Sequence, residues 1–288
     1  MTDLAVLRSE AEIIASSLPA LTFKSTASEA PHVGSAGRRK AGSGEHFWQY
    51  RHYAKEDDAQ RVDWRRSARG DDLYVRETEL ETSRTALFWC DPHPGFDWRG
   101  GTDRRTKADE ARVLMLALGI LLSRDGDRIG VLGSGRTPSF GKRAVDRLLE
   151  DLATDQSGEF PPPPRASAFA VVASDFYDPA ETWEKRLAPL AETCREGILL
   201  AISDPVEVEF PFRGRVRLKR PGETIARIFG RAQSMRETYR EKFQANREAL
   251  DALAKRLGWR LVVHDTNAVS LAGAAALKKA LESFGGKV

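Results

Sequence analysis

The sequence is poor in three features that often define a function class. It has two cysteines, Cys90 and Cys194, in no spacing typical of a redox or metal motif. We therefore expect two thiols buried as small hydrophobic side chains in a reducing compartment. The longest apolar run, residues 113–122, is shorter than the roughly 20 residues of a membrane-spanning helix. No basic, apolar and small-residue series opens the chain, so we expect no secretory signal and a cytoplasmic protein.

The sequence also has little net charge. Its 45 Lys and Arg residues nearly balance 42 Asp and Glu, which leaves a formal charge of +3. That balance indicates mixed-sign surfaces and internal ion pairs, and it argues against a generic polyanion binder. Apolar residues make up 41% of the 288 positions, enough for a folded domain with a substantial core.

From residue 85 onward, apolar strand patterns alternate with helical ones. We expect strands at 86–90, 128–132, 138–140, 169–174, 197–203 and 260–264. We expect helices at 106–122, 144–153, 181–194, 225–257 and from 270 onward, after an N-terminal helix at 3–18. Residues 24–44 read as a loop, and 206–218 as an extended excursion or hairpin around Gly214. This alternation predicts an α/β fold with a mostly parallel sheet flanked by helices.

Four of the expected strands stop at an acidic residue. These acids are Asp91, Asp175, Asp204 and Asp265. Parallel strands bring their carboxyl ends to one edge of a sheet, where ligands of such folds bind. The sequence therefore predicts a rim of acids along that edge.

Residues 37–79 mix dense charge with aromatic side chains. Disordered segments are poor in aromatics, so we expect a fixed network of arginines, carboxylates and rings. Two patterns stand out, Gly42-x-Gly44-Glu45-x-Phe47-x-x-x-Arg51-x-Tyr53 and Arg61-x-Asp63-Trp64-x-x-Ser67-Ala68-Arg69. The network residues we expect are Glu45, Arg51, Tyr53, Asp57, Arg61, Asp63, Trp64 and Arg69. We expect Trp64 to anchor the segment through its indole.

These patterns resemble the domain of unknown function 58 family, which is linked to von Willebrand factor A-type folds. Further matches are Lys107-Ala108, Gly126-Asp127-Arg128-Ile129-Gly130, Ser174-Asp175-Phe176 and Asp204-Pro205-x-Glu207. Departures from the family pattern are Glu56 in place of a glycine and Gln60 in place of an arginine. The resemblance implies an A-like domain over 85–288, with an extended insertion near 205–222. It implies that residues 1–84 form a helix, a loop and a signature segment packed on that domain.

The resemblance also implies a metal-ion-dependent adhesion site, here degenerate. A-type domains end their first strand in Asp-x-Ser-x-Ser, which binds a divalent cation together with a later threonine and acid. The corresponding residues are Asp91, His93 and Gly95, with Asp175 as the later acid. The threonine stays open between Thr137 and Thr154. Because both serine hydroxyls are missing, we expect no magnesium and an arginine or lysine that neutralises the carboxylates. A zinc or manganese site at Asp91, His93 and Asp175 is the alternative.

Other chemistry has little support in the sequence. Asp57 and Asp58 are adjacent acids better explained as partners of arginines than as a catalytic pair. Ser134 lacks the Gly-x-Ser-x-Gly pattern of a nucleophile elbow, and Gly42-x-Gly44 lacks the lysine and helix of a phosphate loop. No cofactor is expected, and the sequence does not predict an enzyme.

Three functions follow, in this order of preference. The first is a non-enzymatic adaptor that contacts its partner through the rim residues Asp91, His93, Gly95, Asp175 and Asp204. The family resemblance implies a MoxR-type AAA+ ATPase as that partner. The second is nucleic-acid binding by the arginines and aromatics of 37–79, against which the interleaved acids count. The third is a metal-dependent enzyme at the alternative metal site.

Overall fold

The computed structural model describes residues 3–22, 41–53, 62–68, 70, 72–79, 84–154, 160–219 and 226–284. For strand residues 41–51 and 76–79, only the backbone is described. The chain divides into two compact units, one of residues 1–24 with 84–288 and one of residues 25–83.

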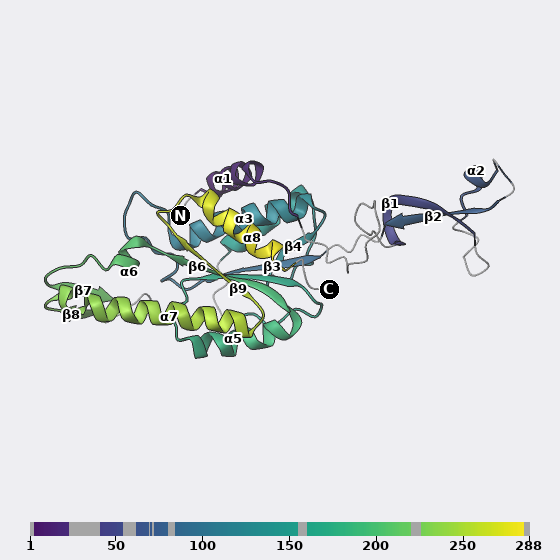
Figure 1. Cartoon of the computed structure of the whole chain (residues 1–288). Coiled ribbons are helices and arrows are strands. Elements are labelled where there is room, and N and C mark those ends of the chain that lie inside the picture. Colours follow the sequence, from purple (N-terminus) through teal and green to yellow (C-terminus); the bar gives the residue numbers. More distant parts are fainter. Residues whose placement is uncertain are drawn as a thin grey trace, which may run out of the picture. The chain divides into compact units, whose positions relative to one another are not determined.

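The larger unit is built on a five-stranded parallel sheet (Figure 1). Its strands are β3 (Thr85–Cys90), β4 (Arg128–Val131), β5 (Phe169–Ser174), β6 (Glu196–Ser203) and β9 (Arg260–Asp265). They lie in the order β4-β3-β5-β6-β9. All six residues of β5 are buried, as expected for a central strand with helices on both faces. The predicted α/β class with a mostly parallel sheet is confirmed.

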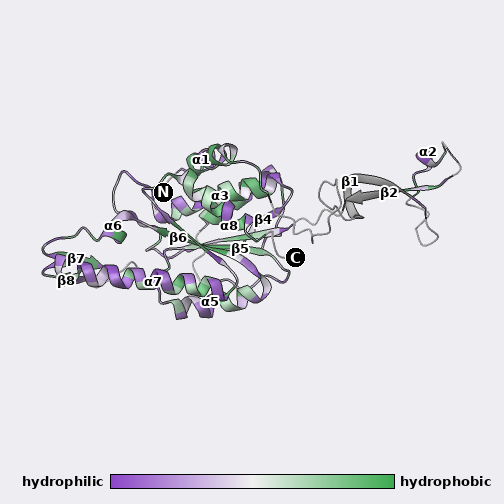
Figure 2. Ribbon diagram, viewed as in Figure 1, coloured by the Kyte–Doolittle hydropathy of each residue, from purple (hydrophilic) through white to green (hydrophobic). Residues whose placement is uncertain are grey.

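Helices cover both faces of this sheet and create two cores. The helices of the larger unit include α1 (Leu4–Ser17), α3 (Lys107–Arg124), α4 (Lys142–Ala153), α5 (Ala180–Thr193), α7 (Arg236–Arg256) and α8 (Ser270–Glu282). Ala86, Phe88 and Cys90 face a core shared with α1, α3, α4 and α8. Leu87 and Trp89 face the other core, shared with α5 and α7. Figure 2 shows the apolar strands enclosed between these helical layers.

The apolar run predicted at 113–122 lies inside α3. It is buried all along its length because α3 packs between the sheet and α1, with α4 and α8 on its two sides. No helix in the described part of the chain is long and apolar enough to cross a bilayer. Both cysteines are buried and unpaired, as predicted, and burial raises the pKa of Cys90 to about 12.

The segment between β6 and α7 differs from the sequence prediction. It begins with a short helix, α6 (Pro205–Glu209), because Asp204 and Glu207 form a capping box and Pro205 suits the first helical position. An antiparallel hairpin follows, made of β7 (Val216–Lys219) and β8 (Ala226–Phe229). Gly214 precedes this hairpin and is not at its turn. The predicted helix 225–257 is therefore wrong in its first part.

Two smaller predictions also need correction. A 3₁₀ turn, η2 (Ala232–Met235), precedes α7, so the long helix starts at Arg236. The strand expected at 138–140 is reduced to a single antiparallel bridge between Ile129 and Ser139 at the β4 edge.

The smaller unit contains an irregular antiparallel pair, β1 (Ala41–His52) and β2 (Tyr74–Glu79). Residues 41–44 thus belong to a strand and not to the loop predicted over 24–44. A one-turn helix, α2 (Trp64–Ser67), begins at Asp63, whose side chain accepts hydrogen bonds from the amides of Arg65 and Arg66. That the unit packs on the main domain stays a prediction.

Candidate functional site at the carboxyl edge of the sheet

The predicted rim follows the carboxyl edge of the parallel sheet. Asp91 follows β3, Asp175 follows β5, Asp204 follows β6 and Asp265 ends β9. After β3 the chain forms β4 on one side of β3, and it then returns to form β5 on the other side of β3. In open α/β sheets this reversal of strand order forms the crevice in which ligands bind. Asp91 and Asp175 stand on its two sides.

A buried lysine lies at the centre of this edge. Lys107 Nζ is 2.9 Å from Asp175 Oδ2 and 2.6 Å from Glu207 Oε1. The residue is fully buried, and its ammonium faces the rings of Trp98 and Tyr177 at 5.7 and 4.9 Å from the ring centroids. Two carboxylates and two aromatic rings therefore form a cage for one positive charge. It is the neutralising cation that the sequence led us to expect.

The start of α3 holds Lys107 in place. The Lys107 amide donates to Trp98 O at 3.0 Å, and the Ala108 amide donates to Phe96 O at the same distance. Thr106 caps the helix by accepting from the Asp109 amide. A positive charge in the first helical turn opposes the helix dipole, so the two carboxylates must offset both this cost and desolvation.

Both carboxylate oxygens of Asp91 accept hydrogen bonds from nearby residues. Oδ1 accepts from the His93 amide at 2.9 Å, and Oδ2 accepts from the Ser174 hydroxyl at 2.6 Å. Burial raises the pKa of Asp91, and the nearby charge of Asp175 adds to the rise. His93 itself is exposed, and its Nδ1 accepts from the buried Gly95 amide at 3.0 Å. The loop is thus closed on itself by hydrogen bonds.

The residues at this edge do not fit a divalent cation. Asp175 is paired with the Lys107 ammonium, and the positions of the two expected hydroxyls hold His93 and Gly95. Within the described ranges, no three His, Cys, Asp or Glu side chains are grouped to hold a metal. The Thr154 hydroxyl donates a hydrogen bond to the Glu150 carbonyl at the end of α4. The Lys107 ammonium already offsets the charges of Asp175 and Glu207.

Asp204 is a fully buried carboxylate with four donors around it. It accepts from the Gly100 amide at 2.9 Å, the Val206 amide at 2.9 Å and Arg104 Nη1 at 3.2 Å. The Thr266 hydroxyl donates to it at 3.3 Å. Asp204 therefore ties the loop after β3 to α6 and to the loop after β9, and its oxygens are already satisfied. Asp265 beside it is half-buried, and burial raises its pKa.

A second buried cation lies beneath the rim and was missed in the sequence. Arg247 of α7 donates through Nη2 to the Ser203 hydroxyl at 2.8 Å, while its Nη1 is buried without a hydrogen-bond partner in the described ranges. Burial lowers the pKa of Arg247, opposed by the charges of Asp175 and Glu207. No local pattern marks it, because nothing in the sequence separates Arg247 from Arg240 and Arg256, which are exposed on the same helix.

Two non-glycine residues with left-handed backbone flank the site, and α7 holds both. Phe176 has φ 54° and Phe210 has φ 46°, which cost conformational energy. Asn246 Nδ2 donates to Phe176 O at 2.7 Å, and Arg236 Nε donates to Phe210 O at 3.0 Å. Side chains of one helix therefore fix the loop that carries Asp175 and the end of α6, the helix that carries Glu207.

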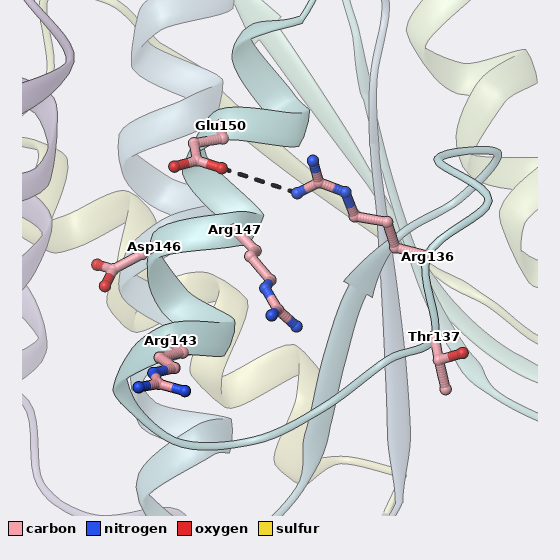
Figure 3. Close-up of a pocket in the computed structure, with 6 residues that line it drawn as sticks. All are labelled: Arg136, Thr137, Arg143, Asp146, Arg147 and Glu150. Carbon is pink, nitrogen blue, oxygen red and sulfur yellow. Dashed lines mark ion pairs between the residues drawn. The ribbon is translucent and has the colours of Figure 1, made fainter.

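The charged pocket in Figure 3 lies away from this network. It is lined by Arg136, Thr137, Arg143, Asp146, Arg147 and Glu150. Arg136 pairs with Asp151 at 3.1 Å and with Glu150 at 3.7 Å, while Asp146 pairs with Arg8 of α1. Thr137, one of the two candidates for the metal-binding threonine, lines this pocket. Arg143 and Arg147, exposed on α4, offer matched control positions for the rim.

Most of the predicted signature network lies outside the described side chains. This applies to Glu45, Arg51, Asp57, Arg61 and Arg69. Of the others, the Tyr53 amide donates to Leu73 O, Asp63 caps α2, and Trp64 is 63% exposed. The network and the anchoring role of Trp64 stay predictions.

Comparisons with known proteins give a family without a known activity. The family described as "Protein of unknown function DUF58" matches residues 49–249. The uncharacterised proteins Rv1480 of Mycobacterium tuberculosis (strain H37Rv) and Mb1516 of Mycobacterium bovis are each 26% identical over 225 residues, which is 72% of this chain and 70% of theirs. Among solved structures, the PilB minor pilin from Streptococcus sanguinis aligns with a TM-score of 0.36 and 12% identity. The alignment covers 74% of this chain and 65% of that pilin.

Proposed function

We propose that this chain, which belongs to the DUF58 family, is a non-enzymatic interaction protein that binds a protein partner at the rim formed by Asp91, His93, Gly95, Asp175 and Asp204. We propose a MoxR-type AAA+ ATPase as that partner, on the family resemblance of the sequence. The role is that of an adaptor which recruits or presents a client to the ATPase.

The observation that carries the proposal is the position of Lys107 between Asp175 and Glu207. An acid–base enzyme needs titratable groups left free to exchange protons with a substrate. Here the central carboxylates are paired with an ammonium, and Asp91 accepts one hydrogen bond from the His93 amide of its own loop and one from Ser174 at the end of β5. A fully satisfied polar network is rigid, which suits a docking surface.

We further infer that the larger unit has a von Willebrand factor A-like fold. Support comes from the strand order, the antiparallel bridge of Ser139 at the β4 edge and the acid that follows β3. In that interpretation, Lys107 takes over the charge of the metal ion of A-type domains, and partner binding becomes independent of divalent cations.

The test is a tagged pull-down of the full chain from its native host, with nuclease, at low and high salt. The wild type is compared with the double variant Asp91→Ala, His93→Ala and with a control, Arg143→Ala, Arg147→Ala, on the exposed face of α4. We expect an AAA+ ATPase with the wild type and the control, identified by mass spectrometry, and its loss with the rim variant. Chelation of divalent cations should leave the captured amount unchanged.

Two outcomes would contradict the proposal. Equal capture of the ATPase by the rim variant and the wild type would show that the contact does not lie at Asp91 and His93. Recovery of nuclease-sensitive material alone, lost at high salt, would favour nucleic-acid binding by residues 37–79 instead.

A further inference from the structure

The strongest charge asymmetry of the molecule lies in residues 210–236, here called the basic arm. Its sequence holds eight Lys and Arg residues against one acid, Glu223, whereas the whole chain has a net charge of +3. The arm therefore carries about +7, and the rest of the chain about −4. This concentration is unrelated to the rim chemistry, and the proposed function makes no use of it.

The two ends of the basic arm are tied together, and the Phe210 ring at its start stacks on Tyr239 of α7 at 4.6 Å between centroids. The Ala232 amide donates to Gly214 O at 2.9 Å, and the Gly214 amide donates to Gln233 Oε1 at 2.8 Å. Arg236 donates to the carbonyls of Phe210 and Phe212. Figure 1 shows the β7–β8 hairpin beside the first turns of α7, at the end far from the central sheet. The hairpin is therefore presented on an anchored base.

The cations of the basic arm have no counter-charge in the described ranges. The exposed set without an ion pair there is Arg213, Arg215, Arg217, Lys219, Arg227 and Arg231. Elsewhere on the unit, exposed arginines such as Arg136 and Arg186 are paired with carboxylates, whereas this set gathers six exposed cations in one short segment. Uncompensated like charges repel one another, so a complementary anionic surface gains from each of them.

One face of the hairpin combines charge with an exposed apolar side chain. In the register of β7 and β8, Arg217 lies opposite Ile228 and Lys219 lies opposite Ala226, so these four side chains share a face. Ile228 is 58% exposed although it is a large aliphatic residue. An isoleucine beside an arginine and a lysine is typical of a protein interface, in which apolar contacts are surrounded by charge.

We propose that this face of the basic arm docks an acidic protein surface that carries an apolar side chain among its carboxylates. Arginine, the main cation here, pairs with carboxylates in a two-pronged geometry. A phosphate backbone offers Ile228 no apolar surface to bury against, which favours a protein over a nucleic acid. The docking is electrostatically steered and weakens with salt.

Fluorescence anisotropy with three labelled probes tests this inference on the full chain. The probes are an acidic peptide of repeating glutamate-glutamate-leucine, the same peptide with serine in place of leucine, and a single-stranded oligonucleotide of equal charge. The variants are Arg215→Gln, Arg217→Gln, Lys219→Gln combined, and Ile228→Thr, which keeps a β-branched residue in the strand. The control is Arg143→Gln, Arg147→Gln.

We expect the wild type and the control to bind the leucine peptide more tightly than either other probe. The triple variant should lose about tenfold in affinity, in keeping with three exposed charge pairs. Ile228→Thr should abolish the preference for leucine over serine while leaving the serine peptide unaffected. Equal or tighter binding of the oligonucleotide, an unchanged preference in Ile228→Thr, or no binding of any peptide would overturn the inference. Rim substitutions should have no effect, so failure here is distinct from failure of the adaptor role.

Discussion

Lys107 Nζ lies 2.6 Å from Glu207 Oε1, which joins the first residue of α3 to the capping box of α6 across the end of the sheet. The same ammonium contacts Asp175 after β5. One side chain therefore sets the relative positions of three segments at the carboxyl edge.

Replacing Lys107 with methionine should be strongly destabilising at neutral pH. It leaves Asp175 and Glu207 buried without their cation, and breaking a buried pair in this way costs about 3–5 kcal/mol. Chemical denaturation of both proteins measures the loss. The triple variant Lys107→Met, Asp175→Asn, Glu207→Gln should regain most of the stability, because it removes the stranded charges. Stability of Lys107→Met equal to the wild type would contradict the assignment.

The stability of Lys107→Met should also depend on pH in a defined direction. Burial already raises the pKa of Glu207 above its ordinary value of 4.5, and Lys107 opposes that rise. Without the lysine, the folded protein binds protons that the unfolded chain releases, so stability is lost as pH rises through the folded-state pKa. The melting temperature of the variant should therefore approach that of the wild type as the pH falls from about 7 to about 5. A difference that does not change with pH would contradict this account.

Asp91→Asn should remove a pH-dependent penalty. Because burial raises the pKa of Asp91, its ionised form is disfavoured in the folded state, and the penalty is complete above the folded-state pKa. An asparagine can still accept from the His93 amide. We expect the variant to gain stability relative to the wild type as pH rises from about 4 to 7, by parallel denaturant titrations. A relative loss over that range would show that the carboxylate is stabilised by its surroundings.

Asn246→Ala should loosen the loop after β5. The amide of Asn246 donates to Phe176 O, whose residue has a left-handed backbone. Loss of this bond leaves a buried carbonyl unsatisfied, at a cost of about 1–3 kcal/mol. Asn267→Ala is the control, since Asn267 is exposed and its side chain makes no hydrogen bond in the described ranges. Equal stability of the two variants would argue against a holding role for α7.

Gly197→Ala tests the packing beneath β6. A Cβ at Gly197 would lie only 2.5 Å from Cδ2 of Trp259. The indole of Trp259 is fully buried, and its Nε1 donates to Cys194 O. Overpacking of this kind costs about 1–3 kcal/mol. Gly230→Ala, where no atom lies within 4 Å of the new Cβ, should change stability by less than about 0.5 kcal/mol. A tolerated Gly197→Ala would show that the indole moves.

The sheet and its acidic edge could be predicted because their signals are local. Each strand is a short apolar run, and Asp91, Asp175 and Asp204 follow such runs directly. The cation between the acids could be expected from charge balance but not assigned to a residue. Lys107 and Glu207 are 100 positions apart, and no periodicity links a helix start to a later capping box. A lysine in the first turn of a buried helix was the one available signal, because the helix dipole disfavours it there.

The segment before α7 was predicted less well. Residues 226–229 fit a helical pattern as readily as a strand, and only the pairing of Ala226 with Lys219 decides between them. Arg247 was missed for a related reason. Its burial depends on where α7 crosses the sheet edge, which the sequence of the helix does not encode.

The most direct test of the account is a thermal-shift titration of the wild-type chain with magnesium, manganese and zinc, beside a chelator control. We predict no saturable rise in melting temperature with any of the three ions, because the Lys107 ammonium already pairs with Asp175 and Glu207. A saturable rise that Asp175→Asn abolishes would contradict the central claim and restore a metal site at this edge.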